Sequence, residues 1–122
     1  MDIVPPYVSR TDARGLFRGI ARVDWGRELN YVESAAGASR GHHYHKTSLE
    51  LFFILDGEVA ATFVDVASGA TDRRRFVKGD AFVVRPFEAH RLDAVTDARW
   101  IQLISSEYDD AAPDMYPFHV PD

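Results

Sequence analysis

Three of the five histidines fall within four residues, at positions 42, 43 and 45. On a β-strand, alternate side chains face the same side. His43 and His45 are therefore expected to point together, and His42 is expected to point the other way. Two imidazoles on one face of a strand can bind a single metal ion, because histidine is the commonest metal ligand in proteins. The spacing thus predicts one half of a metal site.

Two later residues can complete this site. Glu50 follows His45 after a four-residue turn, and a hairpin there would bring its carboxylate back beside the imidazoles. His90 follows a glycine turn and a short apolar strand, which an antiparallel barrel can place beside the first strand. Three neutral imidazoles and one carboxylate suit Fe, Mn, Ni, Co or Zn, whereas Ca and Mg prefer oxygen ligands. We therefore predict a divalent transition-metal ion with open positions for water or a substrate, bound by His43, His45, Glu50 and His90.

The rest of the chain consists of short apolar runs separated by turn residues. No window predicts an amphipathic helix of ten or more residues. The dipeptide Asp56-Gly57, between two apolar runs, is typical of a β-hairpin turn. This pattern predicts an all-β sandwich or barrel. The expected strands are residues 17–23, 28–34, 42–45, 50–55, 58–66, 73–77, 81–84, 91–95 and 99–105.

Length and composition restrict the class of protein. The 122 residues fit one domain, and a net charge of −5 gives no support for a nucleic-acid or anionic-membrane partner. The absence of cysteine excludes disulfides, thiolate metal ligands and a cysteine nucleophile. No signal peptide is recognised, and no apolar run approaches the roughly 18 residues of a membrane span, so a cytoplasmic protein is expected. We expect an N-terminal arm at residues 1–16, a barrel at 17–106 and an extension at 107–122 that packs on the barrel.

One strand indicates how the barrel is covered on the outside. Residues 52–55, Phe-Phe-Ile-Leu, are apolar on both faces of the expected strand. The outward face of such a strand needs a cover, either the N-terminal arm or a second subunit. Because symmetric dimers are the commonest oligomers, we expect a homodimer.

The ligand candidates lie in two motifs that resemble those of the cupin superfamily. A lone His-x-His pair usually has no function beyond a polar surface, but here both family motifs are present. The first family motif is His-x-His, three or four residues, Glu, six residues and Gly. The second is Gly, five residues, Pro-x-Gly, two residues and His. The chain departs from the second motif where Arg85 replaces Pro and Phe87 replaces Gly. The resemblance covers residues 28–106 and implies a single-domain double-stranded β-helix, the jelly-roll barrel of cupins. The matching residues are His43, His45, Glu50, Gly57, Gly79 and His90, with Gly37 upstream.

A longer stretch narrows the resemblance. Residues 40–47, Arg-Gly-His-His-Tyr-His-Lys-Thr, are similar to a stretch in small cupins of polysaccharide and deoxysugar pathways, which are similar to the dTDP-4-dehydrorhamnose 3,5-epimerases. The acidic, proline-containing ending after residue 106 also resembles theirs. This resemblance implies an epimerase or isomerase that acts on a keto-sugar nucleotide. The epimerases proper use a His base, a Tyr acid and no metal, whereas the doubled histidines and Glu50 favour a metal here.

Epimerisation beside a carbonyl needs a base that removes a proton and a group that stabilises the enolate. A metal can stabilise the enolate as a Lewis acid, and an imidazole or a tyrosine can transfer the proton. If the metal is absent, His43 or His45 is the base candidate, and Tyr31 or Tyr44 is the acid candidate, with Tyr44 expected to face away from His43 on a regular strand. Two alternatives use the same ligands: an Fe- or Mn-dependent dioxygenase of a small enediol or diketone, and a non-catalytic cupin that binds a small ligand. The fold does not choose among them.

The last strand offers two residues for a substrate pocket. Trp100 and Gln102 share one face of it, and Ile101 and Leu103 share the other. A polar residue beside an aromatic one suits a ligand cavity, so Trp100 and Gln102 are expected to face inward. In the alternative arrangement Ile101 and Leu103 fill the core, and Trp100 covers the outer sheet.

Three further residues are candidates for contacts with a small-molecule substrate. Phe52 shares a strand face with Glu50 and is expected to line the pocket beside the metal. Phe87 is expected to cap the mouth of the barrel. Arg40, just before the histidines, is expected to contact a diphosphate.

Overall fold

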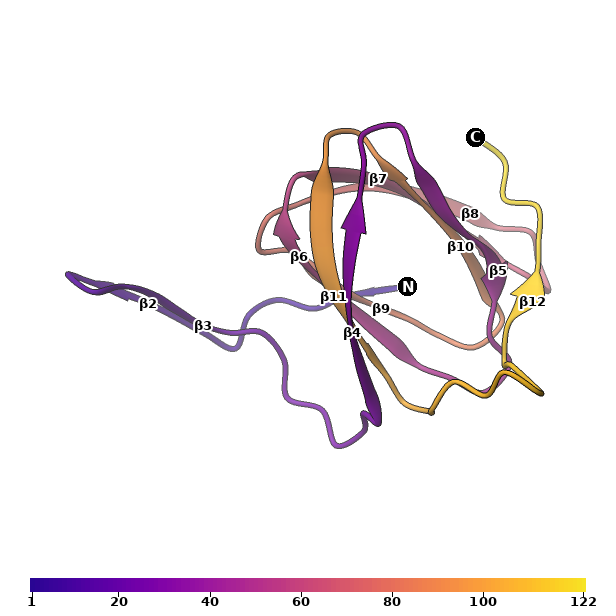
Figure 1. Cartoon of the computed structure of the whole chain (residues 1–122), viewed down its shortest axis with the longest axis horizontal. Helices are drawn as coiled ribbons and strands as arrows, with labels where there is room; N and C mark the ends of the chain where they lie inside the picture. Colours follow the sequence, from indigo (N-terminus) through magenta and orange to yellow (C-terminus); the bar gives the residue numbers. More distant parts are fainter.

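All regular structure in the chain is β-strand, and every pair of neighbouring strands is antiparallel. The computed structural model describes all 122 residues. Sheet I has the strand order β1-β9-β6-β11-β4, and sheet II has the order β12-β5-β10-β7-β8. The two sheets face each other as a jelly-roll barrel, and a β2-β3 hairpin lies beside it (Figure 1). The strands are β1 (Asp2–Ile3), β2 (Val8–Asp12), β3 (Gly15–Gly19), β4 (Glu28–Ser34), β5 (Ser39–Tyr44), β6 (Glu50–Asp56), β7 (Glu58–Asp65), β8 (Thr71–Val77), β9 (Ala81–Val84), β10 (Glu88–Ala94), β11 (Ala98–Ile104) and β12 (Tyr116–Pro117).

The hydrophobic core lies between the sheets and supports a polar site at one end of it. Phe52 of β6 stacks on Phe82 of β9 with ring centroids 4.8 Å apart, and both rings are fully buried. Along β6 the inward residues change from Ile54 and Phe52, which are apolar, to Glu50, which is equally buried but ionisable. The sequence alternation of β6 thus places one carboxylate inside the barrel, directly beyond the aromatic core.

The turn at Asp56-Gly57 does not close a hairpin, which corrects the expectation from the sequence. β6 belongs to sheet I and β7 to sheet II, so the chain crosses from one sheet to the other at this turn. Gly57 has a φ of +83°, and a Cβ there would lie 2.2 Å from the carbonyl oxygen of Asp97. The dipeptide therefore specifies a local backbone conformation that glycine favours. It does not specify which strand pairs with which.

The β2-β3 hairpin projects away from the barrel (Figure 1). Its apolar residues Leu16 and Phe17 are 57% and 64% exposed. The hairpin crosses the boundary expected between residues 16 and 17, and β1, before it, pairs with β9 in sheet I. The division into arm, barrel and extension stays a prediction.

The C-terminal residues pack on the outside of sheet II. β12 pairs with β5, and Val120 is fully buried against Val64 and Ala89. The outer face of sheet I is more open, because Leu29 and Tyr31 of β4 are 66% and 54% exposed. The chain thus covers the outside of one sheet and leaves apolar side chains exposed on the other. The structure contains no helix long and apolar enough to cross a membrane.

Candidate metal centre

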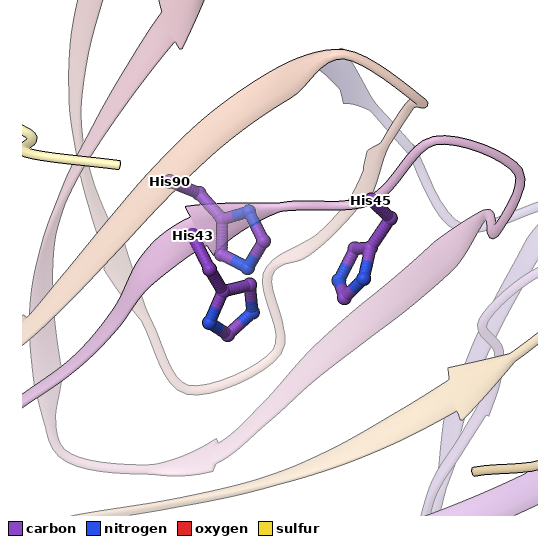
Figure 2. Close-up of side chains that lie close together, drawn as sticks. All are labelled: His43, His45 and His90. Carbon is purple, nitrogen blue, oxygen red and sulfur yellow. The ribbon is translucent and has the colours of Figure 1, made fainter. Parts of the chain in front are cut away.

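Three histidine side chains converge inside the barrel (Figure 2). His43 lies on β5, His45 directly follows β5, and His90 lies on β10. One ring nitrogen from each lies within 4.8 Å of those of the other two. The ring centroids are 5.0 Å apart for His43 and His45, 4.7 Å for His43 and His90, and 5.5 Å for His45 and His90. The expected convergence of these three residues is therefore present.

A β-bulge in β5 sets His43 opposite His90. His43 pairs with His90 and Gly41 pairs with Arg91, so His42 is an extra residue with no partner on β10. His42 and Gly41 have φ angles of +60° and +94°, and a Cβ on Gly41 would lie 2.5 Å from the carbonyl oxygen of His90. His42 lies 2.7 Å from the hydroxyl of Ser39 and takes no part in the cluster. The bulge keeps β10 close and brings the two histidines together.

Glu50 reaches the same point from the facing sheet. Its Oε2 atom lies 2.8 Å from Nε2 of His45 and 4.0 Å from Nε2 of His90. The hairpin expected between His45 and Glu50 is absent, because β5 lies in sheet II and β6 in sheet I. The residues still meet, since the inner faces of both sheets point into one interior.

The contacts of His45 show that a positive charge belongs at this point. Nδ1 of His45 lies 2.6 Å from the carbonyl oxygen of Asp114, which can only accept a hydrogen bond, so Nδ1 carries a proton. In a neutral imidazole, Nε2 then presents a lone pair to the carboxylate of Glu50, 2.8 Å away. Two facing lone pairs repel unless a proton or a cation lies between them. The pair is therefore suited to share a proton or to bind a metal ion.

The ionisation of the four residues agrees with this description. Burial lowers the pKa of His43, and for His90 it lowers the pKa to about 4. Burial also opposes charge on His45, but the hydrogen bond and the charge of Glu50 outweigh it and raise the pKa of His45. Burial acts against the carboxylate of Glu50 as well, yet the bond from His45 and the nearby imidazoles lower its pKa overall. His43 and His90 are thus held neutral, as metal ligands must be.

The two distances from Glu50 fit a divalent transition-metal ion. Metal bonds to histidine nitrogen and carboxylate oxygen of about 2.0–2.1 Å place neighbouring ligand atoms about 3 Å apart and opposite ones about 4 Å apart. The separations of Glu50 Oε2 from the His45 and His90 nitrogens, 2.8 and 4.0 Å, lie in that range. The bond from His45 to the Asp114 carbonyl is the kind of outer contact that orients a ligating imidazole. His43, His45, His90 and Glu50 would hold such an ion.

The burial of His90 predicts how the stability of metal-free protein depends on pH. Folding lowers the pKa of His90 from 6.5 to about 4. Only the unfolded chain binds this proton between those values, so the stabilisation is complete above pH 6.5 and is lost as the pH falls towards 4. The loss corresponds to roughly 3 kcal/mol, which the raised pKa of His45 partly offsets. Urea unfolding of chelator-treated protein at several pH values measures it. His90→Gln should remove most of this dependence, and an equal dependence in both proteins would contradict the assignment.

Three of the residues expected at the pocket lie on the inner face of sheet I. The ring of Phe52 lies 6.1 Å from that of His90, edge to face. Trp100 is fully buried in the core, and its Nε1 is a buried donor without a partner. Gln102 is half-buried on the same face and pairs with Phe52 and with Asn30. The structure thus places Phe52 beside the histidines, with Trp100 and Gln102 on the wall behind it.

The structure does not bring Tyr31 to the centre, which corrects the expectation that it acts as the acid. Tyr31 lies on the outer face of β4 and is 54% exposed. Its hydroxyl donates to the carboxylate of Glu33 at 3.0 Å, on the outside of sheet I. Alternation along β4 explains this position, because Asn30 and Val32 face inward and Tyr31 lies between them.

The side chains of Arg40 and Phe87 also lie away from the histidines, although the backbone N–H of Phe87 donates to the carbonyl of His45 at 2.7 Å. The guanidinium of Arg40 donates to the hydroxyl of Ser34 at 3.0 Å and to the carbonyl of Glu33 at 2.9 Å. Ser34 pairs with Ala98 at the start of β11, whereas Glu50 pairs with the last residue of that strand, so Arg40 is held at the opposite end of the barrel. Phe87 is 49% exposed, and its ring lies 6.0 Å from the ring of Tyr44, which faces outward. A bulky side chain at this position therefore packs on the outside of the barrel.

Two polar residues that the sequence analysis did not single out lie near the centre. A small cavity of about 60 Å³ adjoins His45, and Glu28 of β4 lines it. The carboxylate of Glu28 accepts hydrogen bonds from the side-chain amide of Asn30 at 3.0 Å and from the backbone N–H of Tyr108 at 3.3 Å. The sequence pattern could have indicated these two residues, because polar Glu28 and Asn30 alternate with apolar neighbours. In β4 the polar residues Glu28 and Asn30 face inward.

The fold and the histidine cluster together indicate a class of protein. The cupin domain family matches residues 30–104, which is more than half of the 122 residues. The chain therefore belongs to the cupin family. No curated protein matches its sequence.

Solved structures of three proteins share the fold. The 3′-monoepimerase ChmJ from Streptomyces bikiniensis has a TM-score of 0.79 and 21% identity over 92% of this chain and 66% of its own. The dTDP-4-dehydrorhamnose 3,5-epimerase from Sulfolobus tokodaii has a TM-score of 0.74 and 23% identity, over 84% and 69%. The capsular polysaccharide assembling protein CapF from Staphylococcus aureus has a TM-score of 0.74 and 22% identity, over 95% and 33%. This chain thus spans about a third of CapF.

Proposed function

We propose that this cupin is a metal-dependent epimerase or isomerase that acts on a keto sugar, free or nucleotide-linked, or on a similar carbonyl compound. The observation that carries the proposal is the set of three imidazoles, two buried and one half-buried, and one buried carboxylate beside a small cavity. Fe, Mn, Ni, Co and Zn all suit this donor set. When bound, such an ion polarises a carbonyl oxygen and so eases loss of the neighbouring proton.

The chain's own residues would orient the substrate and exclude water. Phe52 and the aromatic core close the inner end of the site. The hydrogen-bonded pair of Glu50 and His45 supplies its charged groups. In a state without bound metal, His45 and Glu50 share a proton, and His43 and His45 remain the base candidates. With Tyr31 on the outer face, the acid of the reaction comes from another group.

The ligands of two structural relatives favour carbonyl and sugar chemistry. ChmJ is described in complex with dTDP-quinovose, and CapF with the inhibitor 3-isopropenyl-tropolone. A tropolone carries a carbonyl and a hydroxyl oxygen on neighbouring carbons, an arrangement that resembles an enediolate and chelates metals. An enolate with two neighbouring oxygens is therefore the intermediate that we propose for this site.

Deuterium exchange tests the proposal. Metal-loaded protein, incubated with a keto sugar in deuterated water, should incorporate deuterium at the carbon beside the carbonyl, as enolate formation requires. His90→Ala should reduce the rate at least a hundredfold, and His42→Ala, which lies outside the cluster, should not. Oxygen uptake with an enediol or diketone would instead favour the dioxygenase. Neither reaction, with tight ligand binding, would favour a non-catalytic cupin.

The quaternary structure that we propose is a homodimer. The exposed Leu29 and Tyr31 on sheet I, and the exposed Leu16 and Phe17 on the projecting hairpin, are the apolar surfaces that a second copy would cover. Light scattering checks this, because a mass near the 13.7 kDa of one chain would contradict it.

A further inference from the structure

The cavity beside His45 has an acidic lining. Three carboxylates line it, those of Glu28, Glu107 and Asp114, together with the imidazole of His45 and the phenol of Tyr108, and no lysine or arginine lines it. Its volume is about 60 Å³. Pockets that enclose drug-sized ligands measure about 300–1,000 Å³. The cavity thus accommodates only a small group, and that group meets carboxylates in the lining.

Glu28 is the carboxylate of the three whose charge is least compensated. Glu107 lies 3.4 Å from the guanidinium of Arg27. Asp114 accepts five hydrogen bonds from the backbone and hydroxyl groups of residues 46–48. Glu28 has only the amide of Asn30 and one backbone N–H as donors, and neither carries a positive charge. An anionic ligand that enters the cavity would therefore lie against the charge of Glu28.

The rim outside the cavity is also negative. The tail segment at residues 107–114 contains four acids, and no lysine or arginine follows Arg99 in the chain. Arg40 is bound to Ser34 and the Glu33 carbonyl at the other end of the barrel. Lys46 lies over the ring of Tyr116, 4.1 Å from its centroid. Arg27 lies at the rim, but its guanidinium is 3.4 Å from the carboxylate of Glu107. The cation nearest the cavity is thus already paired with one of the lining carboxylates.

We infer that the site takes a small uncharged hydroxy-carbonyl compound, such as a free keto sugar or a shorter polyhydroxy ketone, and rejects its phosphate and nucleoside-diphosphate esters. The acidic lining excludes the charged esters, and Glu28 is the residue that determines this exclusion. Placing an unpaired charge against a like charge is an effective way to exclude a competing ligand. The inference rests on the proposed function for the position of the site, and it chooses the free sugar over the nucleotide-linked one.

Binding of two matched probes tests the inference without reference to turnover. Dihydroxyacetone and dihydroxyacetone phosphate share the hydroxy-ketone group and differ in charge. Titration of cobalt-loaded protein, followed by its visible spectrum, should show dihydroxyacetone binding at least about tenfold more tightly, as expected for like charges a few ångströms apart near a protein surface. High salt should narrow the difference, because salt screens exposed charges.

A matched pair of variants tests whether Glu28 is the residue that sets the ratio of the two affinities. Glu28→Gln keeps the size of the side chain and removes its charge, so it should bring the affinities for the two probes about tenfold closer together. Glu33→Gln, on the outer face of the same strand, should leave the ratio unchanged. An unchanged ratio in Glu28→Gln would refute the assignment to Glu28.

The outcomes for the inference and for the proposed function differ. Tighter binding of the phosphate by the wild-type protein, or binding of neither probe, would overturn the inference. Selective binding of dihydroxyacetone without deuterium exchange would refute the proposed function and leave the inference standing. Exchange with the phosphate ester alone would support the proposed function and refute the inference.

Discussion

A chain in which His90 is replaced by alanine is expected to retain less than about a tenth of the metal bound by the wild-type protein. His90 would supply one of the four proposed ligand groups, and the residue is only 1% exposed, so water replaces it poorly. Changes to groups that merely orient a ligand cost about 10–100-fold in metal affinity. Loss of the ligand itself should cost at least the upper end of that range. Elemental analysis of protein purified without added metal measures the effect.

Metal-dependent stabilisation provides a second measurement for the same variant. A metal present at about 100 times its dissociation constant stabilises the fold by about 2.7 kcal/mol. The unfolding midpoint of the wild-type protein should therefore rise when metal is added, and that of His90→Ala should not. His90→Gln preserves more of the buried volume and separates loss of the ligand from loss of packing.

His42→Ala is the matched control for this experiment. His42 is the immediate neighbour of His43, but it occupies the bulge and lies against Ser39. Its replacement should leave the metal content and the metal-dependent stabilisation unchanged. Full metal content in both His90→Ala and His43→Ala would show that the ion, if one binds, lies elsewhere.

The grouping of the histidines could be predicted because it depends on local periodicity and on spacing along the chain. The two-residue period of a strand places His43 and His45 on one side, and the structure has them there. The position of Glu50 was predicted for an incorrect reason. No hairpin joins β5 and β6; the chain crosses between sheets whose inner faces share one interior. Spacing therefore predicted the neighbours, but it did not predict the strand pairing.

The face of a strand that points inward could not be predicted from alternation alone. The period in β4 is regular, but its polar residues Glu28 and Asn30 face inward and its apolar Leu29 and Tyr31 face outward. The usual rule that apolar side chains face the core fails here, because this end of the barrel is a polar site and the outer face of sheet I is apolar. For the same reason Tyr31 was assigned to the site and Glu28 was not.

The role of Asp114 could not be predicted from the sequence either, because its contacts depend on the path of the C-terminal tail. It lies 66 to 69 residues from its partners in the chain. Nothing local marks this aspartate among the acids of the same segment. Its position follows only once β12 is known to pair with β5, which returns the tail to the end of β5. The tail thus contacts a candidate centre whose four proposed ligands all lie before residue 91.

Asp114→Asn is expected to destabilise both the fold and the centre. The carboxylate of Asp114 accepts from the backbone N–H groups of Lys46, Thr47 and Ser48 at 2.8, 3.0 and 2.9 Å. It also accepts from the hydroxyls of Thr47 and Ser48 at 2.9 and 2.8 Å. Four of these bonds end on Oδ2, so an amide NH₂ at that position would face donors with a donor. The surroundings of residue 114 therefore stabilise an aspartate and destabilise an asparagine.

Hydrogen bonds to a charged group contribute about 1.5–3 kcal/mol each when well shielded. The five bonds are not additive and the site is partly exposed, so a loss of about 2–4 kcal/mol is expected. Partial burial disfavours the charged form of Asp114, but these bonds outweigh it and hold its pKa well below the usual range. This stabilisation is therefore complete above the unfolded pKa, 3.8, and is lost as the pH falls through the lower folded value.

The same change should weaken metal binding about 10–100-fold, because the turn at residues 46–48 joins His45 to Glu50 and the Asp114 carbonyl orients His45. Urea unfolding and metal titration measure the two effects. Asp110→Asn, in the same exposed segment, removes an equal charge and should change neither. Equal losses of stability and of metal affinity in the two variants would show that the charge of the tail causes the effect and that the five hydrogen bonds do not. A destabilised Asp114→Asn protein with unchanged metal affinity would show that the turn keeps His45 and Glu50 together without the tail.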